Sequence, residues 1–392
     1  MSRRWMAPLL ALVIAATLAA DVGLVVARAG DDDTAEPEFT QELPEDFKPV
    51  LAELQAFVEQ SRGLKFKKPP NVALIPDAEF EEVLQGGEEP EAADIEDQEE
   101  FLGVMEALGL FDGDVDLDSA AQGQIASIVG FYNYETEGLY VRSVQLDPYA
   151  KSVLVHELTH ALDDQHFGLY RPDLEDADAG DASSAFQALV EGSAMAVQID
   201  WHKSRSPEER DAIESADQAA VDGLGESEAE GPESEVFAKI GSFPYFVGPR
   251  FVEALRDEGG QAALDAAFED PPTTTEQVLH PQHFIDNRGA LRVSAPPANG
   301  KVVDEGSLGE LGIYLVTGTA VGEGRSVDAS EGWGGDSFKA WSEDDRICIR
   351  WDLRMDTPDD TTELVDVLEV WAADHPGAKV TGRDPVQVTN CA

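Results

Sequence analysis

The segment from His156 to His160 reads His-Glu-Leu-Thr-His and places two imidazoles four residues apart, with a carboxylate directly after the first. On an α-helix such residues point about 40° from each other, one turn apart, so both rings can reach one cation. Zn²⁺ binds imidazole nitrogen at about 2.0–2.1 Å. Glu157 points about 100° from His156, beside such an ion, where a base for an activated water is needed. The pattern predicts one zinc ion, with His156 and His160 as ligands and Glu157 as catalytic base.

The residues around this pattern predict a helix over 148–167. Asp147 suits the N-cap, Pro148 suits the first helical position, and Gly168 is a stop signal. Three leucines lie on the side opposite the histidines: Leu154, Leu158 and Leu162. The apolar side of the helix is therefore expected to face the core. Residues 128–134 and 138–142, which precede the helix, alternate as in a β-hairpin.

A third protein ligand is needed, and two residues are candidates. His166 stands ten residues after His156, the spacing used where a helix breaks between ligands. In a continuous helix it would lie about 15 Å from His156 along the axis, too far to share the ion. Glu191 is the alternative, because it is the only charged residue from Ala182 to Ile199. A helix that is neutral all round is buried, and a buried carboxylate needs a neutralising partner such as a metal.

Two further carboxylates follow the second histidine. Asp163 points over the histidine face of the predicted helix, one turn beyond His160, and could orient an imidazole from outside the ligand set. Asp164 is the alternative for the same role. Either side chain could equally be solvated.

The charge of the chain excludes several classes of function. It has 392 residues with 79 acidic and 27 basic side chains, a net charge of −52. Nucleic acid and anionic membrane surfaces would repel it. Such an excess keeps a protein soluble and monomeric and suits a salt-rich medium, where the self-repulsion is screened. We expect a monomer from a salt-adapted source.

The N-terminus indicates export. Arg3 and Arg4 precede an apolar run, and Ala27-Arg28-Ala29 fits a signal-peptidase site. The alternative is an uncleaved signal anchor, since residues 6–27 are long enough to span a bilayer. Either reading places the rest of the chain outside the cytoplasm, in the medium or at the cell surface. The chain would touch a membrane only through that anchor.

The two cysteines, Cys348 and Cys391, lie in segments that alternate like strands. Outside the cytoplasm such a pair predicts a disulfide. It would tie the C-terminus to the preceding strand.

The domain organisation follows from composition and periodicity. An acidic insertion is expected at 206–234, because that stretch is rich in small and acidic residues and lacks aromatics. The expected parts are a signal peptide or anchor at 1–29, an acidic linker at 30–46, a mostly helical region at 47–124, a core at 125–290 and a C-terminal α/β region at 291–392.

The segment from His156 to Phe167 and the segment Leu189-Val-Glu-Gly-Ser-Ala together resemble exported zinc metallopeptidases of the gluzincin type, which are distantly similar to thermolysin. The segments Pro272–Pro281 and Gly332–Asp336 belong to the same resemblance, which covers about residues 125–392. One departure is Met195, which stands where thermolysin-like enzymes carry an aspartate four residues past the ligand glutamate.

The resemblance implies an α+β, zincin-like fold. It would have a small antiparallel or mixed sheet over the motif helix, a mostly helical second lobe and a C-terminal α/β segment closed by the disulfide. The hairpin strand at 138–142 would hold an extended peptide substrate by strand addition. Glu191 would be the third ligand and Glu157 the base that cleaves a peptide or protein substrate.

The tetrahedral oxyanion of peptide hydrolysis needs a donor besides the zinc. His280 is the first candidate for this donor. Three other residues are the alternatives: Tyr245, His283 and Tyr314. Trp333 and Asp336 either line the cleft or form a plain turn. The competing functions are a zincin-fold binding protein without proteolysis and a surface interaction protein with a structural metal.

Overall fold

The structure is a computed structural model that describes residues 43–76, 79–80, 83, 92–111, 128–142, 146–171, 174, 180–224, 232–344 and 346–392. The expected signal segment at 1–29 and most of the acidic linker at 30–46 lie outside these ranges. None of the helices within these ranges has the length and apolar character needed to cross a membrane.

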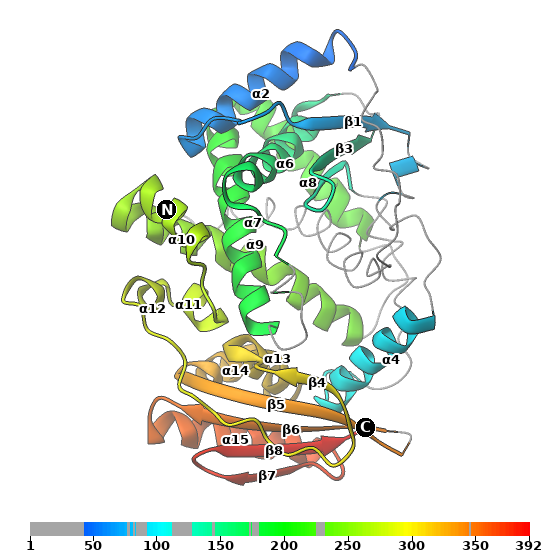
Figure 1. Ribbon diagram of the computed structural model, residues 1–392, viewed down its shortest axis with the longest axis vertical. Coiled ribbons are helices and arrows are strands. Elements are labelled where there is room, and N and C mark those ends of the chain that lie inside the picture. The colour runs from blue at the N-terminus through cyan, green and yellow to red at the C-terminus, as the bar shows by residue number, and fades with distance from the viewer. Residues whose placement is uncertain are drawn as a thin grey trace.

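The chain forms two lobes, one above the other in Figure 1. Among the residues that the structure describes, lobe 1 holds a three-stranded sheet and six helices, and lobe 2 holds a five-stranded sheet and four helices. Two short helices, α11 (Thr275–Leu279) and α12 (Pro281–Ile285), lie between them. Lobe 1 consists of α2 (Phe47–Arg62), β1 (Asn71–Ile75), β2 (Gly130–Asn133), β3 (Gly138–Arg142), α6 (Pro148–Phe167), α7 (Gly180–Lys203), α8 (Pro207–Leu224), α9 (Pro232–Gly259) and α10 (Gln261–Glu269). Lobe 2 consists of α4 (Ala92–Ala107), β4 (Lys301–Gly306), α13 (Gly309–Val321), α14 (Glu323–Ser330), β5 (Trp333–Glu343), β6 (Arg346–Met355), α15 (Pro358–Asp374), β7 (Lys379–Gly382) and β8 (Val386–Cys391).

The sheet of lobe 1 has the order β1-β3-β2, with β1 parallel and β2 antiparallel to β3. It is therefore a small mixed sheet, and it packs on α6 through β2 and β3. The strand predicted to bind substrate, β3, lies in the middle of the sheet with both edges paired. That expectation is wrong, because the hairpin predicted from the local sequence is joined by β1, a strand more than 60 residues earlier whose pairing no local pattern reveals.

Helix α6 spans the predicted residues. The Asp147 side chain accepts a hydrogen bond from Ala150 N at 2.8 Å, Pro148 occupies the first turn, and Gly168 ends the helix at a φ of 67°. Such a positive φ favours glycine because it has no Cβ. Every residue from Ser152 to Asp163 is buried, so both sides of the helix face protein. The leucines pack in one core, while the histidines face α7.

The acidic segment expected as a surface insertion at 206–234 contains a helix, α8, that packs against α6. Ile213 of this helix is fully buried in the core of lobe 1. Composition averaged over the segment does not reveal this buried residue. From Ser206 to Ala216 the other residues are exposed or partly exposed, so the described part of this segment is a surface helix anchored through Ile213.

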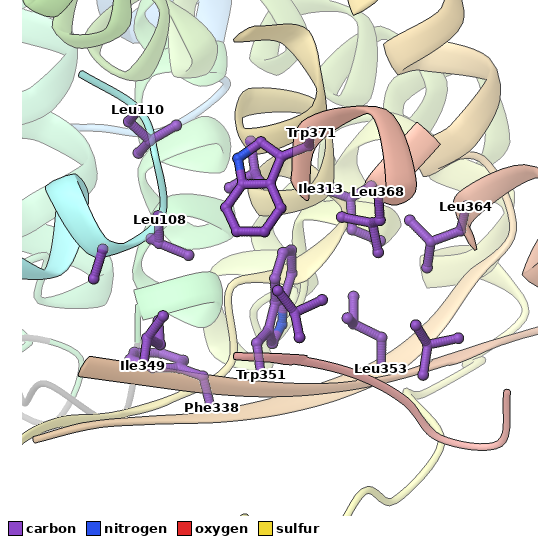
Figure 2. Packing of buried hydrophobic residues seen from close by; sticks show 14 of the residues in the cluster. Leu108, Leu110, Ile313, Phe338, Ile349, Trp351, Leu353, Leu364, Leu368 and Trp371 are labelled. Atoms are coloured by element: carbon purple, nitrogen blue, oxygen red, sulfur yellow. The ribbon is translucent and has the colours of Figure 1, made fainter. Parts of the chain in front are cut away.

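The residues from 47 to 124 do not gather in one place. Helix α2 and strand β1 pack in lobe 1, whereas α4 packs on β6 in lobe 2. Leu108 and Leu110, which follow α4, enter the core of lobe 2 (Figure 2).

Lobe 2 is an antiparallel sheet of order β4-β5-β6-β8-β7 with helices against it. Figure 2 shows Trp351 on the sheet and Trp371 on α15 facing the same core, with Leu364 and Leu368 beside them. The predicted disulfide is confirmed: Cys348 and Cys391 are register partners on β6 and β8, joined by an S–S bond of 2.06 Å. The architecture is thus mixed α/β with a disulfide closing the C-terminus.

Candidate metal centre

Three donor atoms from α6 and α7 converge inside lobe 1. His156 Nε2 lies 3.1 Å and His160 Nε2 3.5 Å from Glu191 Oε2, and the two imidazole nitrogens are 2.9 Å apart. The three residues are 1%, 2% and 8% exposed. The structure therefore brings together the three residues predicted as metal ligands, although Glu191 is 31 residues after His160.

The spacing of these atoms fits a tetrahedral ion. Bonds of about 2.0–2.1 Å give a ligand–ligand separation of about 3.3 Å in a tetrahedron. The measured separations of 2.9, 3.1 and 3.5 Å lie close to that value. Two imidazoles and one carboxylate are also the protein ligands of catalytic zinc sites that keep one position open.

The hydrogen bonds of His156 show why a cation is needed there. Gln198 Nε2 donates to Ser152 Oγ at 3.1 Å, so Gln198 Oε1 is the acceptor that faces His156 Nδ1 at 3.2 Å. His156 Nδ1 then carries the hydrogen, and a neutral ring has a lone pair at Nε2. That lone pair points at Glu191 Oε2, which is also an acceptor. The two acceptors repel each other unless a cation lies between them, either a metal ion or a proton on the ring, so the donor set fits a bound metal.

The charge of Glu191 depends on the two imidazoles beside it. Burial alone would raise the pKa of this carboxyl, but the imidazoles of His160 and His156 outweigh burial and hold the pKa well below its usual range. Glu191 is therefore an anion in the folded protein.

Glu157 lies next to the ligands but is turned to another partner. Its Oε2 accepts a hydrogen bond from Tyr132 N of β2 at 2.9 Å, and the residue is 3% exposed. Burial raises the pKa of Glu157 to about 7; Glu191 adds to the rise, while His156 and the Tyr132 N–H oppose it. A carboxyl that titrates near neutrality can both take and give a proton.

The aspartates predicted to orient an imidazole have other partners. Asp163 Oδ1 accepts from Arg62 Nε at 2.7 Å and Oδ2 from Ser193 Oγ at 2.6 Å. Asp164 accepts from Tyr132 Oη at 2.7 Å and from Leu169 N at 2.6 Å. The group that orients the His156 ring is instead the side-chain carbonyl oxygen of Gln198. Asp163 thus links α6 to α2 and α7, and Asp164 links α6 to β2 and to the residue after Gly168. Within the described residues neither aspartate is hydrogen-bonded to an imidazole.

Sequence reasoning missed Gln198. It stands seven residues after Glu191, two helical turns along the same side of α7. A buried amide at that spacing from a buried carboxylate was the signal that could have found it.

The alternative third ligand and the first oxyanion candidate lie elsewhere. α6 continues to Phe167, and His166 Nε2 faces Lys65 O at 2.8 Å. His280 Nε2 lies 3.0 Å from Glu310 Oε1 of α13. Helix α11, which ends just before His280, contacts α7 through the hydrogen bond from Thr275 N to Asp181. Asp181 stands ten residues before Glu191, which is about 15 Å along the axis of α7. Local sequence could not show that the segment containing His280 packs at the far end of α7.

Of the three remaining oxyanion candidates, two lie in other parts of the structure and one lies beside the imidazoles. His283 Nδ1 lies 3.2 Å from Glu276 Oε1, and Tyr314 is on α13. Tyr245 of α9 is different: its ring centroid is 6.4 Å from that of His156, and it is 1% exposed. Of the four residues, Tyr245 is the one that the structure places beside the imidazoles.

The glycine-rich segment near Trp333 connects β5 to the beginning of α13 through hydrogen bonds. The Asp336 carboxylate accepts hydrogen bonds from Trp333 Nε1, Trp351 Nε1 and the backbone nitrogens of Leu308 and Gly309, where α13 begins. It holds the first turn of α13 against β5 and does not line the metal centre.

A second group of donor atoms consists of Glu343, Cys348 and Cys391. Its sulfurs form the disulfide, and a disulfide sulfur is not a thiolate ligand.

Comparison with known families matches the C-terminal part of the chain. Residues 250–391 match a family described as a domain of unknown function (DUF8575). The matched region runs from the last part of α9 through lobe 2 and excludes His156, His160 and Glu191. No curated protein and no solved structure matches the chain.

Proposed function

We propose that the protein is a zinc-dependent peptidase in which His156, His160 and Glu191 hold one zinc ion. The observation that carries the proposal is the convergence of their donor atoms within 4.8 Å, around a point where an acceptor pair needs a cation. When bound, zinc would polarise a water molecule and the carbonyl of the scissile bond.

Glu157 acts as the general base. It removes the proton from the attacking water and delivers it to the leaving amine. The hydrogen bond from Tyr132 N fixes the orientation of the carboxylate while it does so.

The substrate lies along β2 in this proposal. Arg142 N donates to Val129 O at 2.9 Å, so alternation along an antiparallel pair turns the N–H and C=O groups of Gly130 and Tyr132 away from β3. The Tyr132 N–H does point that way, at Glu157. β3 is the strand partner of β2 within the described residues. An extended peptide added to the outer edge of β2 would therefore run past the metal centre.

Tyr245 is the proposed partner of the oxyanion. Its ring packs beside His156 and against Met195. A phenol hydroxyl at the edge of a metal site can donate a hydrogen bond to the negative oxygen that develops during peptide hydrolysis.

The proposal places the protein outside the cytoplasm, in the medium or on the cell surface, as a monomer. The Cys348–Cys391 disulfide supports an oxidising compartment.

One observation favours a second candidate, a metal-binding protein without proteolysis. His156, Glu157 and His160 are each no more than 3% exposed, which resembles a closed metal site more than an open one. Such a protein would bind zinc and leave peptides intact.

The test uses the purified protein with and without a chelator, incubated with a peptide library and analysed by mass spectrometry. We expect cleavage that the chelator abolishes and zinc restores. Glu157→Gln should abolish cleavage while one zinc per chain remains, and the exposed helix residue change Glu363→Gln should leave both unaffected. Zinc binding without cleavage by the wild-type protein would establish the second candidate instead. Absence of bound zinc would refute both.

A further inference from the structure

We propose that Arg62 of α2 is a positioning residue for the metal centre and that α2 is a permanent part of the catalytic unit. This inference rests on the proposed metal site. The function of Arg62 would be to hold Asp163 as a buried anion, through which α6 and α7 are fixed relative to each other.

Arg62 is an arginine with no exposed surface, 101 residues away in sequence from its main partner. Its Nε donates to Asp163 Oδ1 at 2.7 Å, its Nη1 to Gln261 Oε1 at 3.0 Å and its Nη2 to Asp265 Oδ1 at 3.1 Å. The guanidinium also lies about 6 Å from the rings of two stacked phenylalanines, Phe167 and Phe268. Arginine suits this place because its planar fork reaches several acceptors at once.

Asp163 carries this contact to the metal-binding helices. It is 2% exposed, and its second oxygen accepts from Ser193 Oγ of α7 at 2.6 Å. Asp163 stands three residues after the ligand His160, and Ser193 stands two residues after the ligand Glu191. The Asp163–Ser193 bond therefore joins the two ligand helices within about 5 Å of the ligands along each axis.

A second bond joins the same helices on the other side of the imidazoles. Gln198 of α7 bonds to Ser152 of α6 at 3.1 Å. Along α6 the order is Ser152, His156, His160, Asp163, so the two bonds bracket both imidazoles. Two points of attachment fix the rotation and the translation of α7 against α6, and with them the place of Glu191 Oε2.

Arg62 makes the attachment between Asp163 and Ser193 stable. Asp163 is buried, and without Arg62 it would be an uncompensated anion that must take a proton or draw in water. Either change would weaken its bond to Ser193. Cleavage of the chain after residue 62 would remove Arg62 and this contact, so α2 stays with the working protein.

The test measures Co²⁺ binding by the full-length protein, through the visible absorption of the bound ion and competition with a chelator. Ser193→Ala removes the attachment without changing any charge, and should weaken Co²⁺ binding about 10- to 100-fold and alter the absorption band. Arg62→Leu combined with Asp163→Leu removes the buried pair. The carboxylate that loses its partner, Asp265, has a side chain that is 30% exposed and can be solvated, so the double variant should fold but show the same weakening. Asp265→Asn, which removes a partner of Arg62 outside the ligand helices, should behave like the wild-type protein.

Wild-type Co²⁺ affinity and an unchanged spectrum in both Ser193→Ala and the double variant would overturn the inference and leave the metal site standing. A wild-type protein that binds no Co²⁺ would refute the proposed site and the inference together. The metal-loaded form must also contain Arg62: an intact mass showing that the chain begins after residue 62 would contradict the claim about α2.

Discussion

Replacement of Gly248 by alanine would introduce a methyl group where α7 and α9 are in backbone contact. A Cβ at Gly248 would lie 2.2 Å from Ala188 O and 2.8 Å from the backbone of Gly192. Ordinary contacts of a Cβ begin near 3.4 Å, so the two helices must separate locally by about 1 Å. Because the obstructing atoms are backbone atoms, no side-chain rotation can relieve the contact.

We expect the displacement to move Tyr245 on α9 rather than the proposed ligand on α7, because the Asp163–Ser193 and Gln198–Ser152 hydrogen bonds hold α7 to α6. Tyr245 stands three residues before Gly248 on α9, whereas both imidazoles and Glu191 belong to α6 and α7. Overpacking of this kind costs about 1–3 kcal/mol of stability. A shift of about 1 Å in a catalytic group can cost about 100-fold in rate. We therefore expect Gly248→Ala to lower kcat about 10- to 100-fold and to leave zinc bound.

The assay combines peptide cleavage, zinc content and urea unfolding. The control is Gly324→Ala in α14, a helical glycine whose added Cβ would meet nothing within 4 Å. It should be as active as the wild-type protein and slightly more stable, since alanine favours a helix by about 1 kcal/mol. Gly248→Ala with wild-type kcat and stability would refute the reasoning from the crossing of α7 and α9. Loss of zinc in this variant would show that the shift displaces Glu191 rather than Tyr245.

Three further changes test other parts of the structure. Gln198→Leu removes the acceptor that fixes the His156 ring, and should weaken zinc binding about 10- to 100-fold in a chelator competition; unchanged affinity would contradict the assigned hydrogen position. Burial, with contributions from Asp336 and Glu310, raises the pKa of Asp181 from 3.8 to about 7. The folded protein then binds this proton more tightly than the unfolded chain, so stability falls as the pH rises from about 4 to 7, by at most about 4 kcal/mol. Asp181→Asn should lessen that fall in urea unfolding at a series of pH values, and an identical pH profile would refute the assignment. Cys348→Ser with Cys391→Ser opens a loop of sequence separation 43 and should destabilise lobe 2 by about 4 kcal/mol in thermal unfolding; zinc binding in lobe 1 should persist, and its loss would contradict the independence of the two features.

The sequence predicted those parts of the site that depend on interactions between residues close together in the chain. The limits of α6 follow from Asp147, Pro148 and Gly168, which act within one turn of the helix ends. Glu191 was found because one charge in a neutral helix must have a partner, whatever the fold.

The parts that were not predicted depend on pairing between distant segments. β1 joins β3 across more than 60 residues, and this changed which strand is an edge. Arg62 reaches Asp163 across 101 residues. His280 has the chemistry of a catalytic group, but tertiary packing places it against Glu310. Residue type and spacing predicted the three residues that converge at the candidate metal centre, whereas the groups that hold them in place required the structure.

X-ray absorption spectroscopy of the zinc-loaded protein tests the metal centre most directly. The structure predicts one zinc per chain, bound by two imidazole nitrogens and at least one carboxylate oxygen at about 2.0–2.1 Å. It also predicts that the carboxylate contribution is lost in Glu191→Gln. A chain that binds no zinc, or a zinc environment that Glu191→Gln leaves unchanged, would contradict the account.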